Sequence, residues 1–225
     1  MRMTVAQVRA GLYEASWAPM IDVRVPDVLA HLAAERRLAE KLIESGGYRA
    51  LVEVGCADGS LLLPAAARQR LHYLGIDLAA GAVRAAREAL RDLAATGSVT
   101  QADAAELPGL TAGLPRPLLV AFPFNVIGIL PDPRSVLADC RDAEVLVLTY
   151  DTGEQAAALR SRYYREAGFI GSMTRDQEGV HFAAGDFASS VFEPPVITGW
   201  LRELGFEVSV HRYGVAGLAY LGERS

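Results

Sequence analysis

A loop containing two glycines follows the first strongly apolar run of the chain, in the sequence VEVGCADGS at residues 52–60. Gly55 and Gly59, with the small Ala57 between them, allow a tight turn that exposes backbone N–H groups at the start of the next helix. Such groups bind an anionic or polar part of a ligand. The loop lacks the third glycine of the dinucleotide motif G-x-G-x-x-G, and Glu53 in the preceding strand is foreign to that motif. The pattern therefore indicates a ligand-binding turn that fits a dinucleotide poorly.

Acidic residues stand at the ends of the next two predicted strands. Asp77 ends the run His72–Asp77, where a carboxylate can accept both hydroxyls of a ribose lying between neighbouring strands. Asp103 follows the run Ser98–Ala102. Because open α/β sheets bind ligands at the carboxyl ends of their strands, the loop and the two acids together predict a binding site at that edge. Helix capping is the alternative for Asp77 taken alone.

The elements that must position these residues alternate along the chain. Short apolar runs alternate with longer alanine- and leucine-rich amphipathic segments, which is typical of an α/β fold with a mostly parallel sheet and helices on both faces. Strands are predicted at Ala50–Gly55, His72–Asp77, Ser98–Ala102, Pro117–Phe122, Glu144–Tyr150, Phe206–Arg212 and Ala216–Gly222. Helices are predicted at Asp27–Ser45, with Asp27 as its cap, and at Ser60–Arg70, Ala79–Thr96, Asp132–Cys140, Glu154–Ala167 and Pro195–Leu204.

The last two predicted strands complete a seven-stranded sheet, and two further segments are expected to lie outside it. The last two strands are too close in sequence for a parallel crossover, so we expect them to form a C-terminal antiparallel hairpin. Thr4–Pro26 and Thr174–Pro194 fit neither helix nor strand periodicity well, and we expect irregular lids, binding loops or mobile segments there.

This arrangement resembles the class I S-adenosylmethionine-dependent methyltransferases of the small-molecule type, with a Rossmann-like fold, over nearly the whole chain. In that family an E/D-x-G-x-G-x-G loop holds the methionine part of the cofactor, and VEVGCADGS matches it with Ala57 at the middle glycine. The resemblance implies that Asp77 binds the ribose and that Asp103 and Ala104 contact the adenine. It implies S-adenosylmethionine as cofactor, with Glu53, Gly55, Cys56, Ala57, Gly59, Asp77, Leu78, Asp103, Ala104 and Phe122 as the binding residues.

The acceptor of the methyl group is expected beside the carboxyl ends of the fourth and fifth strands. Methyl transfer is an in-line displacement that depends mainly on proximity and orientation, so Asn125 and Tyr150 are candidate catalytic residues. His181 is a candidate base, because histidine titrates near neutral pH. Helix capping for Asn125 and a solvent-exposed loop for His181 are the alternatives. Aromatic side chains can cover an apolar acceptor, and the predicted acceptor-binding residues are Tyr13, Phe124, Asn125, Tyr163, Phe182 and Phe187.

The composition and net charge of the chain exclude several classes of binding partner. The chain has 225 residues, 51% of them hydrophobic, and a net charge of −5, so nucleic acid and anionic membranes are not expected partners. Two cysteines cannot build a disulfide framework, and neither a signal peptide nor an uncharged run of 18 residues is present, which predicts a cytoplasmic protein. No His, Cys, Asp and Glu cluster has metal-ligand spacing, so no metal is expected.

We therefore expect a single methyltransferase domain over residues 1–225, with an N-terminal lid at 1–26, a Rossmann-like core at 27–225 and an acceptor-lid insertion around 168–194. The predicted reaction is methyl transfer to O, N or C of a small, partly apolar or aromatic acceptor, with specialised metabolism as one setting. Two alternatives stay open at this point. One is a cyclase or lyase that uses the sulfonium only as a charge, and the other is a non-catalytic binding subunit. The sequence does not name the acceptor or the oligomeric state.

Overall fold

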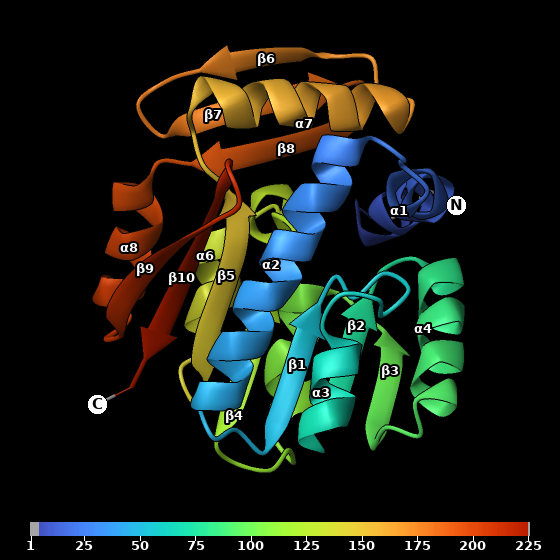
Figure 1. The fold of residues 1–225 in the computed structure, drawn as a ribbon, viewed down its shortest axis with the longest axis vertical. Helices are drawn as coiled ribbons and strands as arrows, with labels where there is room; N and C mark the ends of the chain where they lie inside the picture. The colour runs from blue at the N-terminus through green and yellow to red at the C-terminus, as the bar shows by residue number, and fades with distance from the viewer. Residues whose placement is uncertain (1–4, 225) are drawn as a thin grey trace.

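A seven-stranded sheet with the order β3-β2-β1-β4-β5-β10-β9 forms the centre of the protein (Figure 1). The computed structural model describes residues 5–224, with side chains from Gly11 onward. The first five strands are parallel, and β10 runs antiparallel between β5 and β9. Their bounds are β1 (Ala50–Val54), β2 (His72–Asp77), β3 (Gly97–Gln101), β4 (Leu118–Phe122), β5 (Glu144–Tyr150), β9 (Glu207–Tyr213) and β10 (Gly217–Glu223). The predicted strands, their mostly parallel pairing and the C-terminal hairpin are confirmed.

Helices cover both faces of this sheet. One face packs against α2 (Pro26–Ser45), α3 (Leu63–Gln69) and α4 (Ala80–Asp92). The other packs against α5 (Leu107–Thr111), α6 (Pro133–Ala138) and α8 (Pro194–Glu203), with short 3₁₀ turns η1 (Ala104–Glu106) and η2 (Val126–Ile129). Both faces of the parallel strands are therefore buried, and successive residues such as Leu51 and Val52 belong to opposite cores. No helix in residues 5–224 has the length and apolar composition needed to cross a lipid bilayer.

The start of α2 corrects one prediction. Asp27 was expected to cap this helix, but the helix begins at Pro26 after Val25, and Asp27 lies in its first turn without a side-chain capping bond. Proline suits the first helical position because it has no N–H to leave unpaired. The Asp27 carboxylate instead forms an ion pair with Arg162 at 2.6 Å.

A second, smaller sheet occupies the segment predicted to be irregular at Thr174–Pro194, so that prediction is wrong. It contains β6 (Ser172–Arg175), β7 (Gly179–Ala184) and β8 (Phe187–Phe192), all antiparallel. Together with α7 (Glu154–Glu166) it forms a layer beyond the carboxyl ends of the parallel strands (Figure 1). Its inward side chains, including Phe182 and Phe187, share a third core with α7.

The N-terminal segment is also regular rather than irregular. Helix α1 (Val5–Ile21) lies near the carboxyl ends of β2 and β3, beyond the start of α4 (Figure 1). Residues 1–4 of the predicted lid lie outside the described residues. Apolar residues are spread around α1 rather than gathered on one face, which explains why helical periodicity was not recognised.

A buried arginine joins α7 to the small sheet. Arg160 is 1% exposed and donates to the carbonyl oxygens of Val180 in β7, at 3.1 Å, and of Ser189 in β8, at 2.9 Å. Its guanidinium lies 5.7 Å from the ring centroid of Tyr164. None of the ion pairs among the described residues involves Arg160, so carbonyl oxygens and aromatic faces compensate its charge.

We predict that Arg160→Ala lowers the free energy of unfolding by about 2–4 kcal/mol, because two carbonyl oxygens lose a charged donor in a buried layer. Denaturant unfolding followed by circular dichroism measures this loss. Arg165→Ala, at an exposed position of the same helix, is the matched control and should change stability by less than about 0.5 kcal/mol. Equal stability of the two variants would contradict the prediction.

Candidate active site

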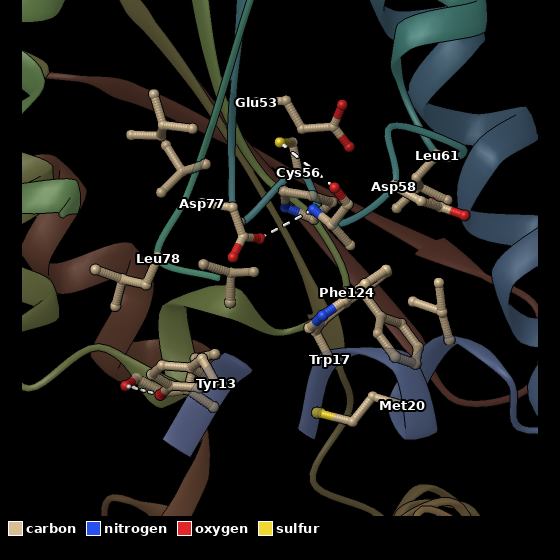
Figure 2. A pocket seen from close by; sticks show the side chains of 18 of the residues that line it. Tyr13, Trp17, Met20, Glu53, Cys56, Asp58, Leu61, Asp77, Leu78 and Phe124 are labelled. Carbon is tan, nitrogen blue, oxygen red and sulfur yellow. Dashed lines mark hydrogen bonds between the residues drawn. The ribbon is translucent and has the colours of Figure 1, made fainter. Parts of the chain in front are cut away.

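A cavity opens at the carboxyl edge of the large sheet (Figure 2). The loop after β1 and the end of β2 form one part of its wall, and α1, the segment after β4, and α7 form the other. In Figure 2, Tyr13, Trp17 and Met20 of α1 face Glu53, Cys56 and Asp77 across the cavity. The position agrees with the general placement of ligands at the carboxyl ends of parallel strands.

The loop after β1 makes a tight turn, in which two small residues adopt a left-handed backbone conformation. Gly55 has a φ of 71° and Ala57 a φ of 46°, both in the left-handed region. A Cβ added at Gly55 would lie 2.6 Å from a methyl carbon of Val126, so only glycine fits beside η2. The Ala57 N–H donates to Oδ2 of Asp77 at 3.0 Å. The loop is therefore fixed to the end of β2 before any ligand binds.

Asp77 is held in place by backbone donors on both sides. Its Oδ1 accepts from the Ala79 N–H at 2.9 Å, while Oδ2 accepts from Ala57. A carboxylate has about four acceptor positions, so each oxygen keeps capacity for a ligand hydroxyl. Burial raises the pKa of Asp77, and the backbone N–H groups of Ala79 and Ala57 act in the opposite direction.

Glu53 is a fully buried carboxyl in the cavity wall. Its Oε2 accepts from the Tyr73 hydroxyl at 2.6 Å, while Oε1 makes no direct hydrogen bond among the described residues, although the nearby Leu62 backbone N–H acts to lower the carboxyl's pKa. Burial raises the pKa of Glu53 to about 8. A buried oxygen without a partner is costly, and a ligand that donates a hydrogen bond to Oε1 would remove that cost.

Arg36 is the one basic side chain among the described residues that line the cavity, and the sequence analysis did not identify it. Its Nη2 donates to the Ser60 carbonyl oxygen at 2.7 Å, and its Nε is buried without a hydrogen-bond partner. In sequence Arg36 is one charged residue of an amphipathic helix. Only the packing of α2 beside the loop after β1 brings it to the cavity.

The opposite part of the cavity is apolar and aromatic. Trp17 and Met20 of α1 lie there with Phe124, whose ring centroid is 5.1 Å from that of Tyr163 on α7. The Tyr13 hydroxyl donates to the Ile129 carbonyl oxygen at 3.4 Å, which joins α1 to the segment after β4. This chamber fits an apolar or aromatic group better than a highly charged one.

The structure brings together about half of the site residues predicted from the sequence. Those that line the cavity are Glu53, Gly55, Cys56, Ala57, Asp77, Leu78, Ala104, Tyr13, Phe124 and Tyr163. Those that do not line it are Gly59, Asp103, Phe122, Asn125, Tyr150, His181, Phe182 and Phe187. Trp17, Met20 and Arg36 are the main additions.

Several of the residues outside the cavity use their polar atoms to hold the fold. Asp103 accepts from the Ala105 N–H and caps η1. Asn125 is 3% exposed, and its amide donates to the Ser189 hydroxyl and the Ser190 carbonyl oxygen. Asn125 stands at the N-cap position of η2 in a left-handed turn, as the capping alternative expects, but its side chain makes no capping bond.

The two other candidate catalytic residues also lie away from the cavity. His181 is in β7, and its ring nitrogens are bonded to the Ser190 hydroxyl at 2.9 Å and to Asp176 at 3.0 Å. Tyr150 is 1% exposed and stacks on His31, with ring centroids 4.5 Å apart. The structure places an aromatic wall, rather than these polar groups, next to the cavity.

Comparisons with known proteins agree with this fold. A family model described as a methyltransferase domain matches residues 52–144. Magnesium protoporphyrin IX methyltransferase from Synechocystis PCC 6803 with bound SAH superposes with a TM-score of 0.67 and 14% identity, over 97% of this chain and 99% of that one. A SAM-dependent methyltransferase from Aquifex aeolicus gives 0.61 and 15%, over 92% and 97%. A comparison with curated proteins finds no match.

A third structure, an S-adenosylmethionine-dependent methyltransferase from Clostridium acetobutylicum ATCC 824, has a TM-score of 0.60 and 12% identity, over 99% of this chain and 100% of that one. At these identities the structures establish the fold. The family model covers part of the central sheet, and the solved structures confirm the Rossmann-like methyltransferase fold that the sequence predicts.

The two buried carboxyls at the site predict a pH dependence of stability. Glu53 has a pKa of about 8 in the folded protein and 4.5 as its ordinary value, and Glu35 of α2 has a pKa raised by burial to about 7. Between pH 7 and 8 the folded chain therefore holds a proton on Glu53 that the unfolded chain has released. We expect the free energy of unfolding to fall as pH rises through this window, by up to about 1.4 kcal/mol per pH unit.

Urea unfolding at a series of pH values from 7 to 8 measures this slope. Glu53→Gln should remove the slope near pH 8, because an amide does not titrate, and leave the smaller slope that Glu35 contributes near pH 7. Glu44→Gln, an exposed position on α2, should leave it unchanged. A slope near pH 8 that is as steep in Glu53→Gln as in the wild-type chain would assign the proton to another group.

Proposed function

We propose that this enzyme transfers a methyl group from S-adenosylmethionine to a small, partly apolar or aromatic acceptor. The observation that carries the proposal is the continuity of the cavity, in which the polar loop after β1 meets the aromatic chamber under α1 without a break. We also propose that the acceptor is a free small molecule in the cytoplasm, in line with the net charge of −5, which disfavours nucleic acid.

The polar part of the cavity fits the cofactor group by group. The unpartnered Oε1 of Glu53 would accept from the cofactor ammonium, and the unpartnered Nε of Arg36 would donate to its carboxylate. Asp77 keeps acceptor capacity for the ribose hydroxyls, while Leu78 and Ala104 offer apolar surface to the adenine. The positive charge on the ligand also matches the two carboxyls in the wall. When bound, S-adenosylmethionine supplies an electrophilic methyl group on a sulfonium.

The residues of the chamber contribute by position rather than by proton transfer. Phe124 and Tyr163 hold an apolar acceptor, and α1 excludes water from it. Proximity and orientation of this kind are worth up to about 7–11 kcal/mol. Because both ring nitrogens of His181 are engaged outside the cavity, we propose that the reaction proceeds without it as a base.

Incubating the enzyme with methyl-labelled S-adenosylmethionine and a small-molecule extract tests the reaction. Mass spectrometry should detect a labelled product together with S-adenosylhomocysteine in equal amounts. Binding of the cofactor without its conversion would favour the alternatives of a cyclase, lyase or binding subunit. Failure to bind either form of the cofactor would overturn the proposal.

Asp77→Ala should weaken S-adenosylmethionine binding at least about tenfold, because two hydrogen bonds to a charged acceptor are lost, each worth about 1.5–3 kcal/mol. Isothermal titration calorimetry gives the dissociation constant. Asp92→Ala, at the exposed end of α4, should not change it. A melting curve of each variant separates lost binding from lost folding, since Asp77 also holds two backbone N–H groups. An unchanged constant would place the ribose elsewhere.

We also propose that α1 acts as the lid of this cavity. The Glu14 carboxylate accepts from the Gly81 N–H at 2.9 Å in the first turn of α4, where a negative charge is favoured by the helix dipole. Trp17 of the same helix packs closely on Gly81. These contacts hold α1 over the cavity, and they are few enough to break when a ligand enters.

Gly81→Ala tests the lid by changing the residue of α4 that α1 contacts. The added Cβ would lie 2.6 Å from Nε1 of Trp17 and 2.9 Å from Glu14, and it should displace α1 while alanine supports α4 itself. We expect methyl transfer to slow by about tenfold or more and Trp17, which is half-buried in the structure, to become more accessible to acrylamide quenching. Gly109→Ala in α5, where a Cβ meets nothing within 4 Å, is the control. Full activity of Gly81→Ala would argue against a lid.

A further inference from the structure

The segment after β4 forms the wall between the two parts of the cavity, and its backbone is strained. Phe124 has a φ of 44° and Asn125 a φ of 63°, two consecutive non-glycine residues in the left-handed region. Pro123, Phe124 and Val126 all line the cavity, and Val126 also packs against Gly55 of the loop after β1. Strained residues persist only where their surroundings hold them. The placement of this wall therefore depends on the groups that bind its backbone.

Glu35 of α2 holds the wall from within the core. Its side chain is 0% exposed, and its Oε1 accepts from the Phe124 N–H at 2.6 Å. Its Oε2 accepts from the Tyr213 hydroxyl at 2.9 Å, and the same hydroxyl is 2.9 Å from the Thr149 carbonyl oxygen. The next residue, Asn125, is held separately through its N–H, which donates to the Leu148 carbonyl oxygen. Glu35 thus anchors the residue whose ring forms the chamber.

Among the described residues, no cation compensates the charge on this anchor. His31, one turn earlier on α2, has Nε2 at 3.7 Å from the carboxylate, but burial lowers the pKa of His31 to about 4, so it is neutral near pH 7. The other titratable groups that act on Glu35 or respond to it are Tyr213 of β9, Tyr150 of β5 and Glu53 of β1. Burial raises the pKa of Glu35 to about 7, with the Phe124 and Tyr213 hydrogen bonds opposing the rise.

We propose that Glu35 is a positioning residue for methyl transfer, whose carboxylate fixes the Phe124 backbone and whose protonation loosens the wall of the acceptor chamber. This inference rests on the proposed function for its effect on rate. Glu35 acts on the cavity wall through its hydrogen bond to the Phe124 N–H. Phe124 lines the cavity in which the acceptor would bind, so a change at Glu35 reaches the acceptor through this residue. Lowering the pH converts a charge-assisted hydrogen bond into a weaker neutral one.

The first test observes the anchor directly and needs no acceptor. In a ¹⁵N–¹H spectrum of the full chain, the Phe124 amide proton should lie downfield and shift upfield as pH falls through about 7. The spectrum of Glu35→Gln should show no such titration, because the side chain stays neutral and nearly the same shape. A Phe124 amide that does not titrate in the wild-type chain would overturn the inference, whatever the enzyme binds.

The second test links the anchor to the rate. Labelled S-adenosylmethionine at saturating concentration and the small-molecule extract serve as substrates, and the rate of wild type is divided by that of Glu35→Gln at each pH. The acceptor's own ionisation cancels in this ratio. We expect a ratio of about five to ten at pH 8 that approaches one near pH 6, because the ionised fraction of a group with a pKa near 7 falls about tenfold per pH unit below it.

Controls separate positioning from mere stability. Glu44→Gln, exposed on the same helix, should give a ratio of one throughout. Glu35→Leu removes the acceptor altogether and should lower the rate at every pH if it folds, while the dissociation constant for S-adenosylmethionine stays within about threefold. A ratio that is the same at all pH values would mean that Glu35 only supports the fold. If the wild-type chain neither binds nor converts S-adenosylmethionine, the proposed function fails, and the amide titration still decides whether Glu35 holds Phe124.

Discussion

The parallel register of β1, β2 and β4 is the constraint on which the site depends. Val52 of β1 pairs with Leu74 of β2 on one side and with Val120 of β4 on the other. Three segments distant in sequence therefore leave the sheet at one edge, and each must turn away sharply. The turns after β1 and β4 use the left-handed backbone of Gly55 and Phe124, and the carboxylate of Asp77 ties the turn after β1 to the end of β2. The site is a consequence of how parallel strands end rather than of any single motif.

The acceptor chamber is built from different parts of the chain than the cofactor end. Helix α1 closes it on one side, while α7, supported by the small sheet through Arg160, closes it on another. These parts touch the core through a separate hydrophobic cluster. Changes in α1 or α7 can alter the chamber without disturbing the strand ends that hold Glu53 and Asp77. This separation explains why one fold can serve many acceptors while keeping its polar loop.

The sequence predicted the large sheet well because buried parallel strands are continuous apolar runs bounded by glycine and acidic residues, as in Ala50–Val54. It failed for α1, whose apolar residues form no stripe, and for β6 to β8, whose short strands mix polar and apolar residues. The sequence could not identify Glu35 as part of the site, since its buried position depends on a contact with Tyr213, which is far along the chain. His181 was misplaced because a strand, rather than a loop, carries it. Tertiary contacts of this kind leave no local pattern in the sequence.

The electrostatics of the site connect the fold to the proposed cofactor. Glu35, Glu53 and Asp77 are three acids gathered at the sheet edge, and burial raises the pKa of each. Among the described residues, no ion pair involves Glu53 or Asp77, and the imidazole next to Glu35 belongs to the neutral His31. Without a ligand, the folded protein reduces the cost of burying these carboxylates by protonating them or by donating hydrogen bonds to them. A ligand with a sulfonium and an ammonium would favour the ionised forms of Glu53 and Asp77, which line the cavity, so the proposed binding of S-adenosylmethionine would stabilise charges that the fold disfavours. S-adenosylhomocysteine has lost the sulfonium charge, and this part of the attraction is therefore weaker for the product than for the substrate.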